Sequence, residues 1–496
     1  MAAIAFVIVF CAPGFTDPDF YWHLKTGQLI AQSGAIPSTD PYSFTYAGKP
    51  WVAHEWLTEL LFYWTVHAGG FLALRCLPAL AAAANFMLLY AIARRLAGKE
   101  LVAALATACF FIPLMPSFTL RPQIFSFLCF TTYLLVLVDF KYFRSTRQLW
   151  LLPVLMLAWV NLHGAFMLGI ALLATFIVCE SGNRWLFPVR HSRTSQRLGL
   201  LCVVTLATLA ATTLNPHGLR ILLYPFETVA MEASKGMIAE WHSPDFHKLL
   251  PRMSLAGIFA WLLATVYARR KPDLTEILLP LLLIFAGLSA WRHLPLMAIV
   301  LMTFFCAMLR HVCPSAILAR AFWWRRREHA GQGQQVTRAQ AGAIHLLVFA
   351  GMVLAALAGA VKTQQEGETS KFVANGAASY LLAHDVSGHL LNDYDLGGYL
   401  IYRLWPTHKV FIDGRADLYG DEFLKAYFKV DKADEGWEKT IDDHAIDIVV
   451  FARHAPLRQV LLASGKFKEA YSDTYHTVLL RDLPRFKPLL DHPVQR

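Results

Sequence analysis

The chain has 496 residues, of which 56% are hydrophobic and only 16% are charged, and its mean hydropathy is +0.42. Soluble domains carry about a quarter of charged residues, so this composition excludes an ordinary soluble protein. The net charge of +10 lies in short basic clusters between apolar runs, a placement that indicates membrane orientation and excludes nucleic-acid binding.

The apolar runs predict a polytopic α-helical membrane protein, because a helix satisfies its own backbone hydrogen bonds in lipid. A run of about twenty apolar residues crosses a bilayer, and on this basis we expect about eleven spans. The first run starts at Met1 with no basic residue before it, which favours a true span over a cleaved signal peptide. The fifth and sixth runs are short for crossing alone. The runs are 2–15, 70–93, 99–116, 122–139, 150–161, 164–180, 199–214, 252–268, 274–290, 293–310 and 342–361.

The chain divides into three predicted parts. Residues 1–69 form the first span and an outer loop with two interfacial helices, 70–361 the transmembrane body, and 362–496 a C-terminal α/β domain. If the N-terminus is cytoplasmic, every basic cluster falls on the cytoplasmic side, as the positive-inside rule expects. The same pattern places the region after residue 361 on the outer side of the membrane. The eight cysteines lie in or beside the spans, which excludes a disulfide framework or cysteine metal site outside the membrane.

Two short helices are predicted in the outer loop. The segment from Phe20 to Ser33 has helical apolar spacing and stops at Gly34. Residues 54–67 are amphipathic and rich in aromatic side chains, which is typical of a helix that lies in the membrane interface. In the C-terminal domain we expect helices near 396–404, 421–429, 433–443 and 455–464, and strands at His389–Leu391, Lys409–Ile412, Ile446–Phe451, Lys466–Tyr471 and Thr477–Leu480.

Ionisable side chains crowd the outer loop of this otherwise apolar chain. Asp17, Asp19, His23, His54 and Glu55 all lie there. Such groups are costly to desolvate at a membrane boundary and are usually kept for chemistry or transport. The predicted topology brings most other unusual polar residues of the body to the same side, which indicates one shared site. These residues are Arg121, Asn161, His163, His217, Glu240, His242, Arg292 and His293.

Several of these candidate site residues also have a purely structural interpretation. Asp19 is placed to cap the helix that starts at Phe20. His163 and His217 belong to turn-like sequences, and Arg121 and Arg292 suit the role of interface anchors. No His-x-x-x-His or paired-carboxylate helix motif occurs, so the spacing predicts no definite metal site.

These features resemble the GT-C superfamily of membrane glycosyltransferases, which use polyprenyl-phosphate sugars. The segment from Asp19 to Lys25 is similar to the Asp-Pro-Tyr-Tyr-His-Leu-Arg loop of archaeal oligosaccharyltransferases. The stretch from Asp17 to Arg75 is similar in layout to the lipid A aminoarabinose transferases. In the C-terminal domain, Asp393 and Tyr394, followed by Asp413 and Arg415, are loosely similar to the Trp-Trp-Asp-Tyr-Gly acceptor-binding element. The loop 115–123 lacks the carboxylates that hold a metal in oligosaccharyltransferases.

The resemblance implies an enzyme that moves a sugar from a polyprenyl-phosphate donor to a lipid, glycan or protein acceptor with inversion. Asp19, or Asp17, would be the general base, and Arg121 and Arg292 would hold the phosphate. The remaining residues would line the substrate cavity. The resemblance also implies a protein of the bacterial inner membrane, surrounded by membrane lipids, with a periplasmic C-terminal domain. It implies no definite cofactor, although a divalent cation is compatible with it. Two other classes stay open: a transporter or flippase, and a non-catalytic protein of envelope polysaccharide assembly.

Overall fold

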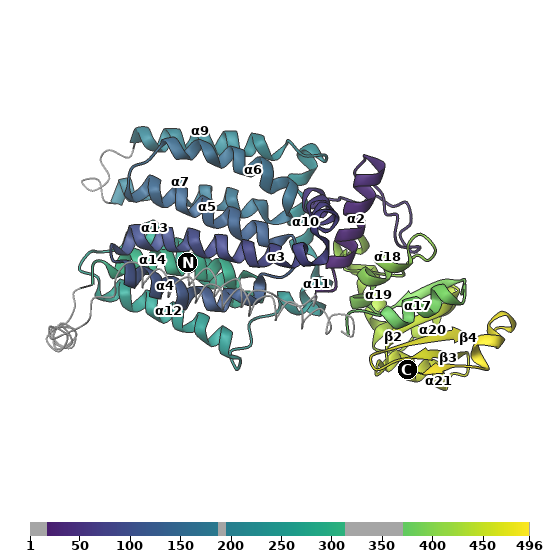
Figure 1. The fold of residues 1–496 in the computed structure, drawn as a ribbon. Coiled ribbons are helices and arrows are strands. Elements are labelled where there is room, and N and C mark those ends of the chain that lie inside the picture. The colour runs from purple at the N-terminus through teal and green to yellow at the C-terminus, as the bar shows by residue number, and fades with distance from the viewer. Residues whose placement is uncertain (1–16, 187–194, 313–370, 496) are drawn as a thin grey trace, which may run out of the picture.

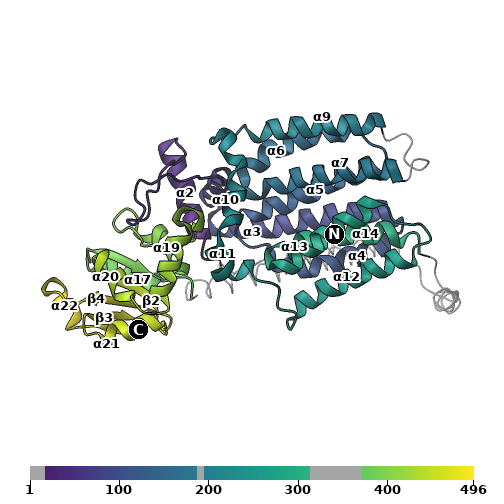
Figure 2. The same cartoon turned by 180° about the vertical axis from the view of Figure 1, so that it is seen from behind.

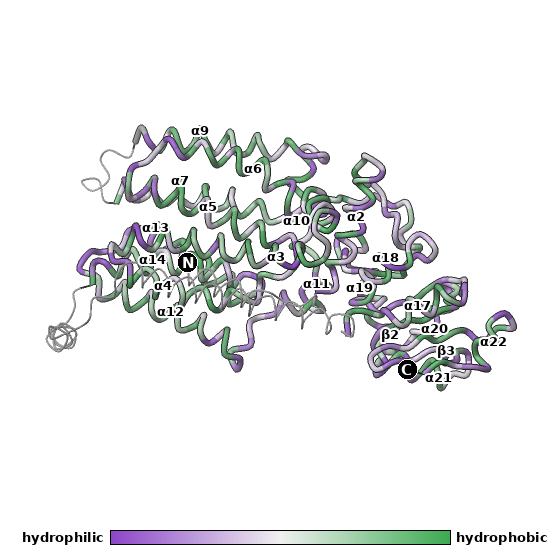
Figure 3. The backbone as a smooth tube through the Cα atoms, in the orientation of Figure 1, coloured by the Kyte–Doolittle hydropathy of each residue, from purple (hydrophilic) through white to green (hydrophobic). Residues whose placement is uncertain are grey.

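The structure is a computed structural model that describes residues 17–186, 195–312 and 371–495. Long helices lie side by side in one body, and an α/β domain sits at one end of it next to α2 (Phe20–Ser33) (Figure 1). The short helices α10 (Tyr224–Ala230) and α11 (Glu232–Met237) lie at the same junction when the molecule is seen from behind (Figure 2). Hydrophobic residues dominate the long helices, and hydrophilic residues gather at their ends (Figure 3).

The helical body accounts for every predicted apolar run that falls within the described residues. Six helices are long and apolar enough to cross a membrane, namely Trp56–Ala97, Glu100–Ser117, Gln123–Tyr142, Gly164–Leu186, Leu249–Tyr267 and Trp291–Leu309. Shorter apolar helices are Arg147–Leu162, Arg197–Thr212 and Leu274–Ser289. The predicted runs 2–15 and 342–361 lie outside the described residues.

The helices of the body follow one another with short connections. Their bounds are α3 (Trp56–Ala97), α4 (Glu100–Phe111), η1 (Ile112–Ser117), α5 (Gln123–Tyr142), η2 (Arg147–Trp150), α6 (Leu151–Leu162), η3 (Gly164–Phe166), α7 (Met167–Leu186), α9 (Ser195–Thr212), η4 (Gly218–Leu222), η5 (Ala239–Trp241), α12 (Leu249–Tyr267), α13 (Leu274–Ser289), η6 (Trp291–His293) and α14 (Leu294–Leu309). Almost all of α14 is buried, so this helix runs through the core of the body.

Three glycines set the geometry of the outer loop and of the helix that follows it. Helix α2 covers the predicted range and ends at Gly34, whose φ of 69° is the left-handed conformation that glycine adopts without cost. Within α3 the helical dihedrals break at Gly69 and Gly70, and Gly70 has φ 66° and ψ −169°. The break falls between the predicted interfacial helix and the following span, so the two segments have different directions.

A buried ionic network joins the far ends of three helices. Lys141, near the end of α5, pairs with Glu180 of α7 and lies 2.9 Å from Asp273, which caps α13. Burying a charge is tolerated only when partners compensate its lost hydration. This network therefore fixes the helix ends opposite the junction with the α/β domain.

The C-terminal domain is built on a five-stranded sheet of order β1-β2-β4-β3-β5. β1 pairs with β2, and β3 with β5, in parallel, whereas β4 pairs with both β2 and β3 in antiparallel fashion. The strands are β1 (His389–Asn392), β2 (Ile446–Ala452), β3 (Phe467–Ser472), β4 (His476–Arg481) and β5 (Val494–Gln495). The helices are α17 (Asn375–Ala383), η7 (Tyr394–Leu396), α18 (Gly397–Leu404), α19 (Ala416–Asp431), α20 (Trp437–Asp443), α21 (Pro456–Ala463), η8 (Pro484–Phe486) and α22 (Lys487–Leu490).

One predicted strand, Lys409–Ile412, is wrong. Val410 instead forms an isolated parallel bridge with Ser43 of the outer loop. Its N–H donates to the Tyr42 carbonyl at 3.1 Å, and its own carbonyl accepts from the Phe44 N–H at 3.1 Å. The extended apolar segment therefore binds the C-terminal domain to the outer loop rather than adding to the sheet.

Candidate active site

A cavity of about 1200 Å³ lies at the junction of the outer loop, the helical body and the C-terminal domain. Its wall is ionic near the outer loop and apolar along α7, where Met167, Leu168, Ile170, Ala171 and Ala174 face it. Twelve of the residues singled out in the sequence line this cavity. They are Asp17, Asp19, His23, His54, Glu55, Arg121, His163, Glu240, Arg292, Asp393, Tyr394 and Arg415.

The other five singled-out residues, Asn161, His217, His242, His293 and Asp413, do not line the cavity. The Asn161 side chain accepts from Trp56 Nε1 at 2.8 Å and donates to the carbonyl oxygens of Leu157 and Leu214. Its hydrogen-bonding capacity is thus used in holding the interfacial part of α3 against the end of α9. His242 and His293 hydrogen-bond to nearby backbone carbonyls of Gly236 and Ala286.

Arg121 lies at the centre of an ionic cluster. Its Nε is 2.6 Å from Asp17 Oδ2, its Nη2 pairs with Asp19 Oδ2, and its Nη1 pairs with Glu240 Oε1. These carboxylates come from the outer loop and from η5, two regions far apart in sequence. Since all three guanidinium nitrogens hold carboxylates, Arg121 is committed to them and is a poor candidate for a phosphate.

Asp17 and Asp19 each pair with Arg121 through Oδ2, but they differ in the hydrogen bond that Oδ1 accepts. Asp17 Oδ1 accepts from the Asp19 N–H at 3.1 Å, and its Oδ2 also lies 3.4 Å from Thr119 Oγ1. Asp19 makes no side-chain capping hydrogen bond to α2, contrary to the capping interpretation. Its Oδ1 has a long contact of 3.4 Å with Trp22 Nε1. Asp19 Oδ1 therefore has a weaker hydrogen bond than either oxygen of Asp17, and it lies against the backbone of Gly414 at the edge of the cavity.

Burial governs the protonation of these two carboxyls. Desolvation raises the pKa of Asp17 to about 6, although the Arg121 charge opposes the shift. Desolvation also raises the pKa of Asp19, against the charge and hydrogen bond of Arg121 and with the help of Glu240. A carboxylate with a raised pKa is a stronger base than an exposed one, so this environment suits proton acceptance.

A second cluster surrounds Glu55 with three imidazoles. His23 Nε2 lies 3.6 Å from Glu55 Oε2, while the Nε2 atoms of His54 and His163 lie 3.5 and 3.4 Å from Oε1. Desolvation alone would raise the pKa of Glu55, but the charge and hydrogen bond of His54 are the main causes that outweigh it and hold that pKa below its usual range. Glu55 is therefore ionised, and the histidines orient around it.

The three histidines do not share one charge state. Burial lowers the pKa of His23 to about 3 and that of His163 to about 4. The Ala165 N–H donates to His163 Nδ1 at 3.2 Å, which leaves the ring proton on Nε2, facing Glu55. Burial also acts to lower the pKa of His54, but Glu55 overcomes this and raises it. Glu55 therefore favours the protonated form of His54, whereas burial favours the neutral form of the other two rings.

Arg292 provides a different cationic group in the same cavity. Its guanidinium carbon lies 4.4 Å from the ring centroid of Trp241. Within the described parts of the chain it has no carboxylate within 4.0 Å, in contrast to Arg121. A guanidinium that stacks on an aromatic face keeps its N–H groups available for an anion.

Two glycines, Gly414 and Gly398, let the C-terminal domain approach the outer loop closely, and a third, Gly397, packs within the domain. A Cβ on Gly414 would lie 1.7 Å from Asp19 Oδ1, and a Cβ on Gly398 would lie 2.4 Å from the Pro18 carbonyl oxygen. A Cβ on Gly397 would lie 2.3 Å from the Ile412 carbonyl oxygen. Gly398 and Gly414 thus contact the loop that carries Asp17 and Asp19 through bare backbone, whereas Gly397 allows residues 397 and 412–413 to pack together.

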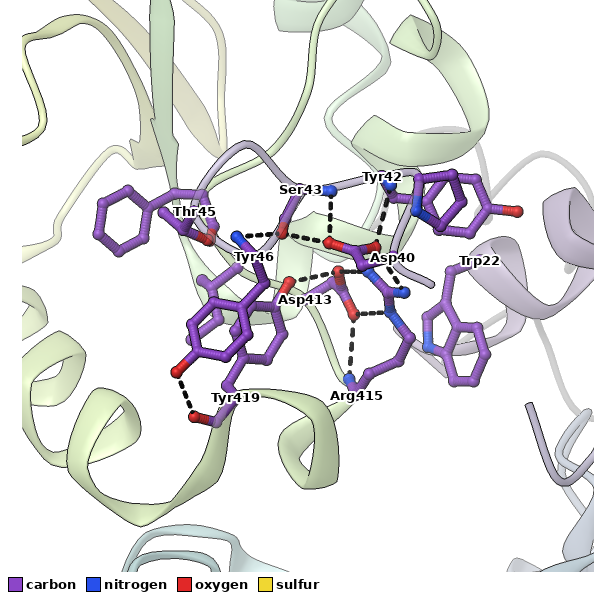
Figure 4. A network of polar contacts seen from close by, with 12 residues as sticks. Trp22, Asp40, Tyr42, Ser43, Thr45, Tyr46, Asp413, Arg415 and Tyr419 are labelled. Carbon is purple, nitrogen blue, oxygen red and sulfur yellow. Dashed lines mark hydrogen bonds and ion pairs between the residues drawn. The ribbon is translucent and has the colours of Figure 1, made fainter. Parts of the chain in front are cut away.

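A buried ionic network centred on Arg415, called the lock below, holds the C-terminal domain against the outer loop (Figure 4). The Arg415 guanidinium lies 2.8 Å from Asp40 of the outer loop and 2.7 Å from Asp413, and it stacks on Trp51 at 4.6 Å. The Tyr419 hydroxyl donates to Asp413 Oδ2 at 2.7 Å. Arg415 is 1% exposed even though it borders the cavity, so the Asp413–Arg415 pair has the structural arrangement of a locked turn.

The C-terminal domain adds acidic groups that sequence reasoning missed, namely Asp395, Asp417 and Asp431. Desolvation raises the pKa values of Asp393 and Asp395 to about 6. Tyr224, whose ring stacks on His54 at 4.3 Å, was also missed. These residues carry no motif of their own, because only the fold brings them to the cavity. Among the described residues, no group of three or more His, Cys, Asp or Glu is arranged to hold a metal ion.

Comparison with known proteins identifies the fold. No protein-family model matches the sequence, and no curated protein matches it. The oligosaccharyltransferase AglB from Archaeoglobus fulgidus, in complex with an inhibitory peptide and a dolichol-phosphate, aligns over 91% of this chain and 68% of its own length. The TM-score is 0.53 at 12% identity, and the apo form of this enzyme gives the same values. ArnT from Cupriavidus metallidurans, bound to undecaprenyl phosphate, covers 96% of both chains with a TM-score of 0.49 and 14% identity. The likeness to AglB shows that the protein has a GT-C-like fold.

Proposed function

We propose that the protein is a membrane glycosyltransferase that moves a sugar from a polyprenyl-phosphate donor to an acceptor hydroxyl outside the plasma membrane, with inversion. The observation that carries the proposal is the cavity itself. A weakly hydrogen-bonded carboxylate oxygen of Asp19, an uncommitted guanidinium of Arg292 and an apolar wall from α7 meet in one space. The GT-C-like fold of AglB supports the same activity class.

The acceptor hydroxyl would bind at Asp19. Its oxygen attacks C1 of the sugar from the face opposite the phosphate, and the hydroxyl proton passes to Asp19 Oδ1. The C1–O bond to the phosphate breaks, and its electron pair leaves with the phosphate oxygen. The products are an inverted glycoside, the lipid phosphate and a protonated Asp19, which returns its proton to water.

The donor phosphate would bind at Arg292. Phosphate is a good leaving group and needs little acid assistance, but its negative charge needs a cationic partner. Arg292 has N–H groups to offer, whereas the guanidinium of Arg121 is already paired on every side. The polyprenyl chain would then follow the apolar residues of α7 toward the lipid.

The placement of polar groups favours an enzyme over a transporter. A transporter needs its polar pathway near mid-bilayer and between repeated halves. Here the ionic groups of the cavity come from the loops and helix ends beside the C-terminal domain. A non-catalytic assembly protein would not need a desolvated carboxylate beside a free guanidinium.

Mass spectrometry of lipid-linked sugars in a deletion strain tests this function. The proposal predicts an accumulating polyprenyl-phosphate sugar and a missing glycan, lipid or protein modification, both restored by the wild-type gene. Unchanged pools of lipid-linked sugars together with an unchanged envelope would contradict it.

A further inference from the structure

The carboxylates around Arg121 are arranged like the ligands of a metal cation, but the guanidinium of Arg121 occupies the position of the cation. Three carboxylates, Asp17, Asp19 and Glu240, approach one guanidinium from separate segments of the chain. Each uses a different nitrogen, with 2.6 Å between Arg121 Nε and Asp17 Oδ2. The Arg121 side chain is 20% exposed, so these charges meet with little water between them.

The cluster needs a cation for electrostatic reasons. Three carboxylates this close repel one another strongly where the dielectric constant is low. Oxygen-only ligand sets such as this one are what Mg²⁺ and Mn²⁺ prefer. Arginine meets the same need with a permanent charge and a fixed fork of donors, and it cannot dissociate.

The resemblance to oligosaccharyltransferases is compatible with a bound divalent cation. The residues of this chain, however, do not fit such a cation. The segment 115–123 contains no carboxylate and contributes Arg121 instead. The guanidinium fills the space toward which the three carboxylates point, so a metal ion would have to displace it. The described residues offer no alternative group of metal ligands either.

We propose that Arg121 replaces the divalent cation of this fold and acts as a positioning residue for Asp19. It holds Asp19 Oδ2, which leaves Oδ1, with its long contact of 3.4 Å to Trp22 Nε1, as the oxygen that would take the acceptor proton. The role assigned to Asp19 rests on the proposed glycosyl transfer, but the replacement of a metal by Arg121 is tested without any transfer assay.

Mn²⁺ binding to the purified full-length protein in detergent, followed by the loss of the free-ion electron paramagnetic resonance signal, tests the proposal. Wild type should bind no Mn²⁺ in the cavity. Arg121→Ala should gain one equivalent, because the three carboxylates are left with an empty space. Adding Glu240→Gln or Asp19→Asn to Arg121→Ala should weaken that binding at least tenfold.

Arg292→Ala is the matched control, because it removes a cavity arginine that holds no carboxylate among the described residues. It should gain no Mn²⁺. Arg121→Ser is measured beside Arg121→Ala as a second variant that opens the same space. Wild-type binding of one Mn²⁺ that is lost in Asp19→Asn would overturn the proposal, and so would a folded Arg121→Ala that binds none. If neither arginine variant folds, the wild-type titration decides: absence of binding supports the replacement, and binding refutes it. Failure of glycosyl transfer would leave these metal titrations unaffected, so the two proposals fail separately.

Discussion

Replacement of Gly414 by alanine should disable the site while leaving most of the fold intact. The new Cβ would lie 1.7 Å from Asp19 Oδ1 and 2.7 Å from Asp19 Cγ. Heavy atoms in good contact are about 3.5 Å apart, so one of the two groups must move by more than an ångström. Either Asp19 leaves its pair with Arg121 or the loop 413–415 retreats from the outer loop.

The size of the effect follows from these distances. Overpacking of this kind costs about 1–3 kcal/mol of the free energy of unfolding. Displacing a reacting group by about 1 Å can lower a rate roughly 100-fold. We therefore expect a modest loss of stability and a much larger loss of glycan formation in a complemented deletion strain.

Gly199→Ala is the control for this experiment. Gly199 lies in α9 with nothing within 4 Å of its Cβ position, so alanine there should raise helix stability by about 0.5–1 kcal/mol. Glycan formation in this control should stay at the wild-type level. A Gly414→Ala protein with wild-type thermal stability and wild-type glycan formation would refute the close approach of the C-terminal domain to Asp19.

Three further predictions concern the lock, the acid limb and the orientation. Arg415→Met should lower the free energy of unfolding by about 3–5 kcal/mol, because it leaves Asp40 and Asp413 buried and unpaired; Lys466→Met, which breaks an exposed pair with Asp442, should cost less than about 1 kcal/mol in the same thermal scan. The transfer rate should fall on the acid side at a higher pH than an ordinary aspartate would give, because burial raises the pKa of Asp19, the proposed base, and raises that of neighbouring Asp17 to about 6. Glu240→Gln removes a charge that raises both pKa values, so the acid limb in a pH–rate profile should move to lower pH; a limb that stays or moves up would contradict this electrostatic account. A phosphatase fusion after residue 370 should be active and one at residue 330 inactive, and the reverse pattern would overturn the assignment of the site to the outer face.

Local sequence signals were sufficient for elements that depend on near neighbours. Helix α2 was predicted over its observed range, since its apolar spacing and the left-handed Gly34 are both local features. The strand predicted at Lys409–Ile412 was wrong because Val410 pairs with Ser43, a partner on the distant outer loop. An apolar extended segment looks the same in sequence whether it joins a sheet or a loop.

The same contrast between local and long-range features applies to the candidate site. Asp19, Arg121 and Arg292, which the charge pattern predicts on one side of the membrane, line one cavity in the structure. The predicted topology did not reveal that Arg121 is paired with carboxylates whereas Arg292 stacks on Trp241. Nor did it find Asp417 or Asp431, since their approach depends on how the C-terminal domain packs against the outer loop.

Glycan formation by Asp19→Asn tests the central claim most directly. Asparagine keeps the size of the side chain but cannot accept the acceptor proton, and loss of a positioned base costs about a hundred- to ten-thousand-fold in rate. Asp19 makes no capping hydrogen bond through its side chain, so helix α2 should form as in wild type. Asp17→Asn and the double variant are measured beside it, by lipid-linked sugar and glycan content in the complemented deletion strain. The account predicts accumulated donor and little glycan in Asp19→Asn and in the double variant, whereas a folded double variant with normal glycan would contradict it.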